Sequence, residues 1–182
     1  MLIESGFQNK THISEFKMID FKEEQKFTQW WLWLILLALG LIPLFGIYEQ
    51  LIKKGQFGDK PMSDSGLILF AIFVFGLISL MFLMKLKTEI SSSGIKMTFF
   101  PFVKKSVDWK DIKSIKIVRY EFVGYGIRIG SKYGTVYNTK GDIGLAIETR
   151  SGQKFVIGTQ KQEELQNIIQ KYFIPANSAG EH

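Results

Sequence analysis

Two uncharged stretches decide the fold: Phe27–Tyr48, FTQWWLWLILLALGLIPLFGIY, and Ser65–Met84, SGLILFAIFVFGLISLMFLM. A helix of about 20 apolar residues crosses the roughly 30 Å hydrocarbon core of a bilayer, and both stretches are long enough to do so. Because neither contains Asp, Glu, Lys or Arg, two buried helices of a soluble core are the less favoured alternative. The first stretch starts too late and runs too long for a cleaved signal peptide. The sequence therefore predicts a transmembrane helical hairpin over 27–86, with spans at 27–48 and 65–84.

Aromatic residues and lysines flank these spans, as is typical of the two membrane interfaces. Lysine ammonium groups beside a span can also reach the lipid headgroups. The expected interface anchors are Trp30, Trp31, Trp33, Tyr48, Lys85 and Lys87. Fewer lysines lie in the short loop between the spans than beside their outer ends. By the positive-inside rule, this predicts a multi-pass protein of the cytoplasmic (inner) membrane with both termini in the cytoplasm.

The composition is that of two unlike parts. The 182 residues are 46% hydrophobic and 22% charged, and their formal net charge is +6. Residues 85–182 hold 16 basic and nine acidic side chains, whereas residues 1–26 hold four basic and five acidic ones. The C-terminal part is therefore a basic domain beside a membrane. No recognised nucleic-acid-binding motif accompanies this charge, so we expect no nucleic-acid partner.

The chain after Lys87 changes to short β-like runs separated by turn residues. These runs are Ile95–Phe100, Val103–Val107, Ile112–Phe122, Ile127–Ile129, Tyr133–Tyr137, Leu145–Thr149 and Lys154–Ile157, and the last two flank a tight-turn signal at 150–153. Thr159 and Gln162 fit a capping box before apolar residues at helical spacing, which predicts a helix of about 14 residues that ends at Pro175. A similar pair, Asp20 and Glu23, predicts that the first spanning helix starts near Phe21.

These observations predict an α+β membrane protein with four parts. An N-terminal cytoplasmic segment, 1–26, precedes the hairpin, and a domain over 87–174 follows it. The domain is expected to be a bent antiparallel sheet of about seven strands, capped by one C-terminal helix. Residues 175–182 are expected to form a flexible tail.

The domain sequence resembles the bacterial pleckstrin-homology (PH-like) family over about residues 87–173. The resemblance rests on Gly126–Arg128, Val136–Asn138, Gly141, Leu145–Ile147, Ile157–Gln160 and Glu164–Leu165, with Ile95, Pro101, Val107, Trp109 and Ile112–Ile117 upstream. It implies a PH-like fold of seven strands and a helix, commonly placed after one or two membrane spans. It implies an interaction module and no reaction. The compact Lys…Arg-x-Arg pattern of inositide-binding PH domains is missing around Lys96 and Lys104–Lys105.

The sequence offers no constellation for catalysis. It has no Cys, which excludes disulfides, thiolate nucleophiles and Cys-based zinc sites. Its two histidines, His12 and His182, lie near opposite ends of the chain, so neither has a partner as general base or ligand. No glycine fingerprint for nucleotides is present. We therefore expect no enzyme activity, no cofactor and no metal site.

The residues expected to bind a partner or lipid are basic and aromatic, since Arg and Tyr are enriched at interface hot spots. They are Arg119, Tyr120, Arg128, Lys132, Tyr133 and Lys140, whereas Tyr137 and Trp109 are expected in the core. The leading hypothesis is a non-catalytic scaffold or assembly factor that binds another protein at the cytoplasmic face of the membrane. The alternative is a sensor or binder of anionic lipid headgroups or of a small ligand.

Overall fold

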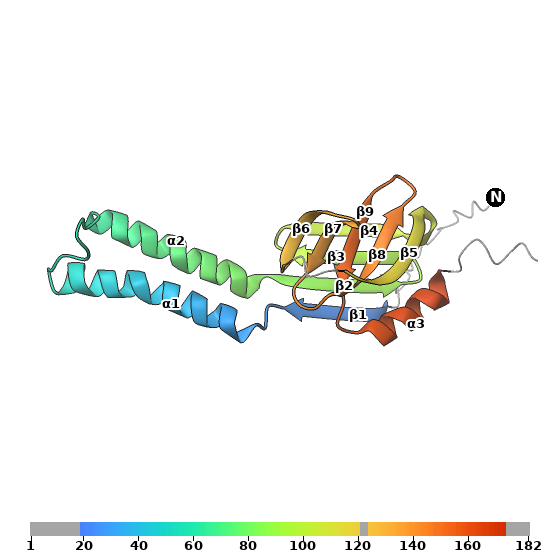
Figure 1. The fold of residues 1–182 in the computed structure, drawn as a ribbon, viewed down its shortest axis with the longest axis horizontal. Helices are drawn as coiled ribbons and strands as arrows, with labels where there is room; N and C mark the ends of the chain where they lie inside the picture. Colours follow the sequence, from blue (N-terminus) through green and yellow to red (C-terminus); the bar gives the residue numbers. More distant parts are fainter. Residues whose placement is uncertain (1–18, 121–123, 174–182) are drawn as a thin grey trace, which may run out of the picture.

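The computed structural model describes residues 19–120 and 124–173, and it divides into a helical hairpin and a β domain (Figure 1). The predicted tail, Pro175, Phe122 and both histidines lie outside the described residues. The helices are α1 (Trp30–Ile47), continued by a π-helical turn η1 (Tyr48–Ile52), then α2 (Asp64–Leu83), a 3-10 turn η2 (Trp109–Asp111) and α3 (Gln162–Tyr172). The strands are β1 (Ile19–Lys26), β2 (Lys85–Ser91), β3 (Gly94–Phe100), β4 (Val103–Asp108), β5 (Ile112–Arg119), β6 (Gly126–Ser131), β7 (Gly134–Asn138), β8 (Ile143–Thr149) and β9 (Lys154–Gly158).

The hairpin pairs α1 with α2 through small residues. Gly40, Pro43 and Gly46 are the buried residues of α1, and a Cβ added at Gly46 would lie 3.0 Å from the Phe57 ring and 3.1 Å from Leu67. The lack of side chains at the glycines thus lets the helices approach closely. Both helices are long and apolar enough to cross a membrane, and their bounds match the predicted spans to within a few residues.

The hairpin interrupts the β domain instead of preceding it. β1, before α1, pairs antiparallel with β2, which starts immediately after α2, so that Lys26 lies opposite Lys85. The prediction that a helix starts near Phe21 is therefore wrong, and the predicted domain, 87–174, leaves out β1. The strand forms because alternate side chains, Phe21, Glu23 and Gln25, face the interior while those between them face solvent.

The strands form two sheets instead of the single antiparallel sheet that the sequence predicts. Within the described ranges there are nine strands, in the orders β1-β2-β3-β4 (sheet A) and β5-β8-β9-β7-β6 (sheet B). All neighbours are antiparallel except β7 and β9, which pair in parallel with Val136 opposite Val156. Sheet A follows the long axis of the hairpin (Figure 1). The antiparallel expectation thus fails at one pair of strands.

The main core lies between the two sheets and α3. Its fully buried members include Leu86 and Phe99 of sheet A and Leu145 and Phe155 of sheet B, and Leu165 of α3 packs with them. Tyr137 is buried here, as predicted. The Trp109 indole packs against this core, stacks on Tyr172 at 5.4 Å and donates a hydrogen bond to the Ser91 carbonyl.

The helix α3 is shorter than predicted and starts later. Its N-cap is Lys161, so the predicted capping box of Thr159 and Gln162 does not form. The Thr159 hydroxyl instead accepts a hydrogen bond from the Lys161 N–H at 3.0 Å and donates one to the Glu23 carboxylate at 2.7 Å. A side chain from β1 therefore replaces the predicted local cap partner of Thr159.

Polar side chains of β1 and of the segment between β1 and α1 form hydrogen bonds with residues of sheet B and its loops. The Gln25 amide donates to the Gly158 carbonyl at 2.8 Å and accepts from the Thr139 hydroxyl at 3.1 Å. The Gln29 amide donates to the Thr139 carbonyl at 2.6 Å. Gln29 directly precedes α1, so these bonds fix the loop after β7 beside the point where the chain enters the hairpin.

Candidate functional site

A cavity of about 220 Å³ on sheet B is lined by three lysines. It lies over β5, β8, β9 and the turn between β6 and β7. Its lining residues are Ser114, Lys116, Lys132, Tyr133, Ala146, Ile147, Glu148 and Lys154. We call it the lysine cavity.

The floor of the lysine cavity is an apolar cluster on the face of sheet B opposite the main core. Val118, Val136, Ala146 and Val156 are buried there, and Tyr133 packs against them. β-branched residues of neighbouring strands pack well on a pleated face, which explains how a rigid platform forms beneath the lysines. The Tyr133 backbone N–H donates to the Ser131 hydroxyl at 3.2 Å, which fixes the turn that carries the ring.

Two ammonium groups lie over the Tyr133 ring. The Nζ atoms of Lys116 and Lys132 are 6.0 and 5.1 Å from its centroid. An ammonium within about 6 Å of an aromatic face is attracted by the quadrupole of the ring. The ring thus helps to hold two like charges near one another.

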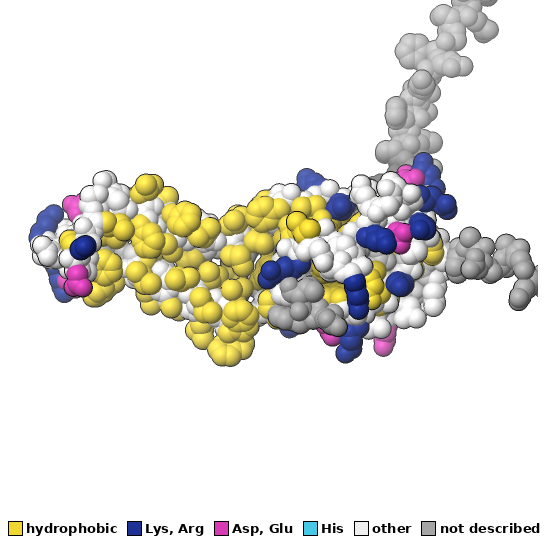
Figure 2. Space-filling model, turned by 45° about the horizontal axis from the view of Figure 1, so that its top comes forward, with side chains coloured by type: hydrophobic (Ala, Val, Ile, Leu, Met, Phe, Trp, Pro, Cys, Tyr) yellow, Lys and Arg dark blue, Asp and Glu magenta, His cyan; other side chains and the backbone are white. Residues whose placement is uncertain are grey.

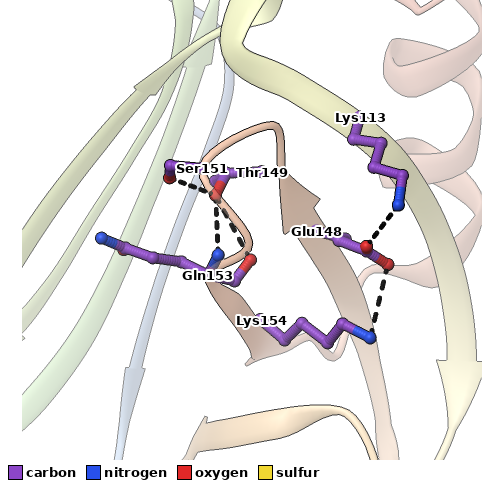
Figure 3. A network of polar contacts seen from close by, with 6 residues as sticks. All are labelled: Lys113, Glu148, Thr149, Ser151, Gln153 and Lys154. Atoms are coloured by element: carbon purple, nitrogen blue, oxygen red, sulfur yellow. Dashed lines mark hydrogen bonds and ion pairs between the residues drawn. The ribbon is translucent and has the colours of Figure 1, made fainter.

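One carboxylate bridges two further lysines at the edge of the cavity (Figure 3). The Lys113 Nζ lies 2.9 Å from Glu148 Oε1, and the Lys154 Nζ lies 3.7 Å from Glu148 Oε2. The hydrogen bond from Lys113 is the main reason that the pKa of Glu148 lies below its ordinary value, and Lys154 lowers it further. The lining thus contains three lysines, Lys116, Lys132 and Lys154, and one carboxylate, which also pairs with Lys113. The excess positive charge favours an anionic ligand.

The hairpin between β8 and β9 positions Lys154. The Thr149 hydroxyl lies 2.8 Å from that of Ser151 and accepts a hydrogen bond from the Gln153 N–H at 3.0 Å (Figure 3). Gly152 has φ +86°, a left-handed conformation that glycine adopts without steric cost. The tight turn predicted at 150–153 is confirmed.

The structure divides the predicted binding residues into three groups. Lys132 and Tyr133 line the lysine cavity. Tyr120 is only 2% exposed, which corrects its assignment to a surface. It directly follows β5 and belongs to the apolar cluster beneath the lysine cavity, where burial raises the pKa of its hydroxyl.

Arg119, Arg128 and Lys140 form the third group, at the end of sheet B nearest α1. Arg119 pairs with Asp142 at 3.6 Å. The Arg128 guanidinium lies so close to Gly124 that a Cβ there would approach its Nη2 to 2.5 Å. Lys140 is exposed and follows Thr139, which Gln29 contacts. These three are not part of the lysine cavity.

The predicted membrane anchors lie at the ends of the helices. Trp30, Trp31 and Trp33 are in the first turn of α1, where the Trp31 ring is 6.5 Å from Tyr125. Tyr48 starts η1 at the far end. Lys85 and Lys87 belong to β2, and they pair with Glu24 at 3.3 Å and Glu89 at 2.7 Å.

Sequence reasoning missed Lys116, Lys154 and Glu148. They come from three strands, and their separations along the chain carry no motif. The alternation of polar and apolar residues in β5 was the only available signal, since it places Ser114 and Lys116 on one face.

Among the described residues, no group of three or more His, Asp or Glu side chains could hold a metal ion. The lysine cavity offers fixed cations, a hydroxyl and an aromatic ring. This combination suits the binding of an anionic group. Glu148 is held as a carboxylate by its lysine partners.

Comparison with known proteins identifies the family of the chain. The profile of the bacterial PH domain family matches residues 13–176, a range that includes β1 and the inserted hairpin. No curated protein and no solved structure matches the chain. PH domains are in general non-catalytic modules that bind proteins or lipids. The resemblance seen in the sequence is confirmed: the chain belongs to the bacterial PH domain family.

Proposed function

We propose that this chain is a membrane-anchored, non-catalytic binding module that presents its lysine cavity to an acidic segment of a partner protein. In this proposal α1 and α2 cross the bilayer, and the PH domain lies at the cytoplasmic face with both termini. The module acts as a scaffold or assembly factor. The observation that carries the proposal is the excess of ammonium groups around the cavity.

The surface of the hairpin supports its place in a bilayer. Of the most apolar 18-residue stretch of α1 and η1, only 17% is buried, and of the corresponding stretch of α2 only 11% is buried. Figure 2 shows apolar side chains along the hairpin, with charged side chains at its tip and on the domain. An exposed apolar surface of this extent is rare in a soluble monomer, whereas a bilayer would cover it.

The position of the lysine cavity favours a protein over a lipid of the same membrane. The end of β9 at Gly158 contacts Gln25 near the entry to α1. Lys154 lies at the other end of that strand, about 13 Å away at roughly 3.3 Å per residue. A headgroup at the base of the hairpin would first meet Arg119, Arg128 and Lys140 instead. The cavity is thus better placed for a partner that approaches from the aqueous phase.

The test is capture of partners from native membranes in mild detergent. The variant with Lys116→Glu and Lys132→Glu removes the charge excess, and Lys96→Glu with Lys110→Glu changes the net charge equally at exposed sites outside the cavity. We expect the wild type and the control to recover the same partner and the cavity variant to lose it. We also expect the captured complex to weaken with ionic strength, because charge drives its formation.

Equal recovery of the partner by both variants would contradict the proposal. A second arm measures binding of the same proteins to anionic and zwitterionic vesicles. If the cavity variant keeps its partner and loses only its preference for anionic vesicles, the lipid-binding alternative replaces the scaffold.

A further inference from the structure

The turn between β3 and β4 carries an exposed apolar tip. Phe100 and Phe102 are 41% and 54% exposed, and Pro101 lies between them. The turn is well defined, since the Phe102 N–H donates to the Phe99 carbonyl at 2.8 Å. Phe99 itself is fully buried in the main core. The backbone therefore presents two aromatic rings to the outside on a fixed support.

The register of sheet A places this tip beside the end of α2. Lys85, the first residue of β2, lies directly opposite Phe100. Met84 alone separates Lys85 from the last residue of α2, Leu83. Since β3 runs antiparallel to β2, its continuation into Pro101 and Phe102 extends toward the helix. The two rings thus lie at the level where α2 leaves the domain.

Lysines lie behind the tip on the outer face of sheet A. Residues directly opposite one another on neighbouring strands share a face. The row level with the tip is Lys26, Lys85 and Phe100, and the next row on that face is Glu24, Lys87, Thr98 and Lys104. Two residues along a strand correspond to about 7 Å. The ammonium groups of Lys26, Lys85, Lys87 and Lys104 therefore follow the aromatic tip at the depth expected of lipid headgroups, with the Glu24 carboxylate paired to Lys85 and that of Glu89 to Lys87.

We infer that the turn between β3 and β4 inserts Phe100 and Phe102 into the interfacial layer of the bilayer, as a third membrane contact beside α1 and α2. This inference rests on one part of the proposed function, that α2 spans the membrane. Apolar and aromatic side chains backed by lysines bind at the boundary between headgroups and acyl chains. A contact displaced from the hairpin also limits rotation of the domain about the hairpin axis, and so orients the lysine cavity.

The chain has no cysteine, so single cysteines can be labelled cleanly. Phe102→Cys tests the tip, and Ser92→Cys, exposed in the turn at the other end of β2 and β3, is the matched control. Phe73→Cys, exposed on α2, reports whether that helix is in lipid. Each full-length variant carries an environment-sensitive fluorophore, is checked for a wild-type thermal unfolding midpoint, and is reconstituted into vesicles with and without spin-labelled lipids.

We expect blue-shifted, lipid-quenched emission at positions 102 and 73, and water-like, unquenched emission at position 92. Quenching at 73 with none at 102 would overturn the inference and leave the spanning helix intact. Blue-shifted but unquenched emission at 102 would also overturn it, since protein would then cover the tip. Equal quenching at 92 and 102 would show that the tip is not selectively inserted. A lack of quenching at 73 would contradict the membrane anchor itself.

Discussion

Replacement of Glu23 by alanine tests whether β1 is an integral strand of the PH domain. The Glu23 side chain points inward from β1 and is 5% exposed. Its carboxylate accepts two hydrogen bonds of 2.7 Å, from the Thr159 hydroxyl and from the Gln160 N–H. Both donors lie between β9 and α3, more than a hundred residues away in the chain. The substitution removes these links between the two ends of the domain.

The expected decrease in the free energy of unfolding follows from the number and kind of these hydrogen bonds. A hydrogen bond to a charged group contributes about 1.5–3 kcal/mol. The loss of stability from removing the two bonds is offset in part, because the variant no longer buries a carboxylate. We expect Glu23→Ala to lower the free energy of unfolding by about 2–4 kcal/mol, since it also leaves the Gln160 N–H without its acceptor.

The neighbouring residue provides the control. Glu24 points to the outer face and pairs with Lys85 at 3.3 Å, with 36% of the Glu24 side chain and 39% of the Lys85 side chain exposed. An exposed ion pair contributes about 0–1 kcal/mol, so Glu24→Ala should be nearly neutral. The assay is denaturant unfolding of the full-length protein in detergent micelles, followed by near-ultraviolet circular dichroism of its aromatic side chains. Equal stability of the two variants would refute the integration of β1 into the domain.

Three further substitutions test other parts of the structure, each by thermal unfolding in detergent. Gly134→Ala should destabilise the domain by about 1–3 kcal/mol, because its Cβ would lie 2.0 Å from a carbonyl of β9 at φ +87°; an unchanged midpoint would refute the pairing of β7 with β9. Gly46→Leu should weaken the hairpin by about 1–3 kcal/mol, whereas Gly76→Leu, with no described atom within 4 Å of its Cβ, should not; equal effects would contradict the packing of α1 on α2. Glu148→Gln should cost stability at neutral pH and progressively less in acid. The Lys113 hydrogen bond holds the folded-state pKa of Glu148 below 4.5, so its contribution is present above pH 4.5 and is lost as pH falls through the lower value; a difference that does not shrink in acid would contradict the ion pair.

The sequence predicts most of the domain because its strands and α3 carry strong local signals. The alternation in β5 and the turn between β8 and β9 place these elements to within a few residues. The same holds for α1 and α2, whose apolar stretches are uninterrupted. Such elements are encoded by residues close together in the chain.

The strand β1 could not be predicted in this way. Its inward row holds Glu23 and Gln25 beside Phe21, so it lacks the apolar alternation that marks a half-buried strand. The polar side chains of Glu23 and Gln25 form hydrogen bonds with Thr139, Gly158, Thr159 and Gln160. That compensation comes from segments far along the chain, which a local pattern cannot reveal. The parallel pairing of β7 with β9 is non-local for the same reason.

Of the residues predicted to bind a partner, only Lys132 and Tyr133 line the lysine cavity. Lys132 and Tyr133 were proposed because basic and aromatic side chains are typical of interfaces. Lys116, Lys154 and Glu148 join them through sheet pairing, in which β8 lies between β5 and β9. Tyr120 was placed on the surface because a tyrosine beside an arginine is typical of an interface, whereas the end of β5 turns it into the interior.

The most direct test of the membrane anchor uses the insertion of the hairpin between paired strands. Because Lys26 lies opposite Lys85, a short glycine-containing turn can replace residues 27–84 and join β1 to β2 directly. The measurement is the distribution of the intact and shortened chains between membrane and supernatant after an alkaline wash. We predict that the intact chain stays with the membrane, whereas the shortened chain is soluble and folded. Release of the intact chain into the supernatant would contradict the anchor, and with it the account of a binding module held at the bilayer.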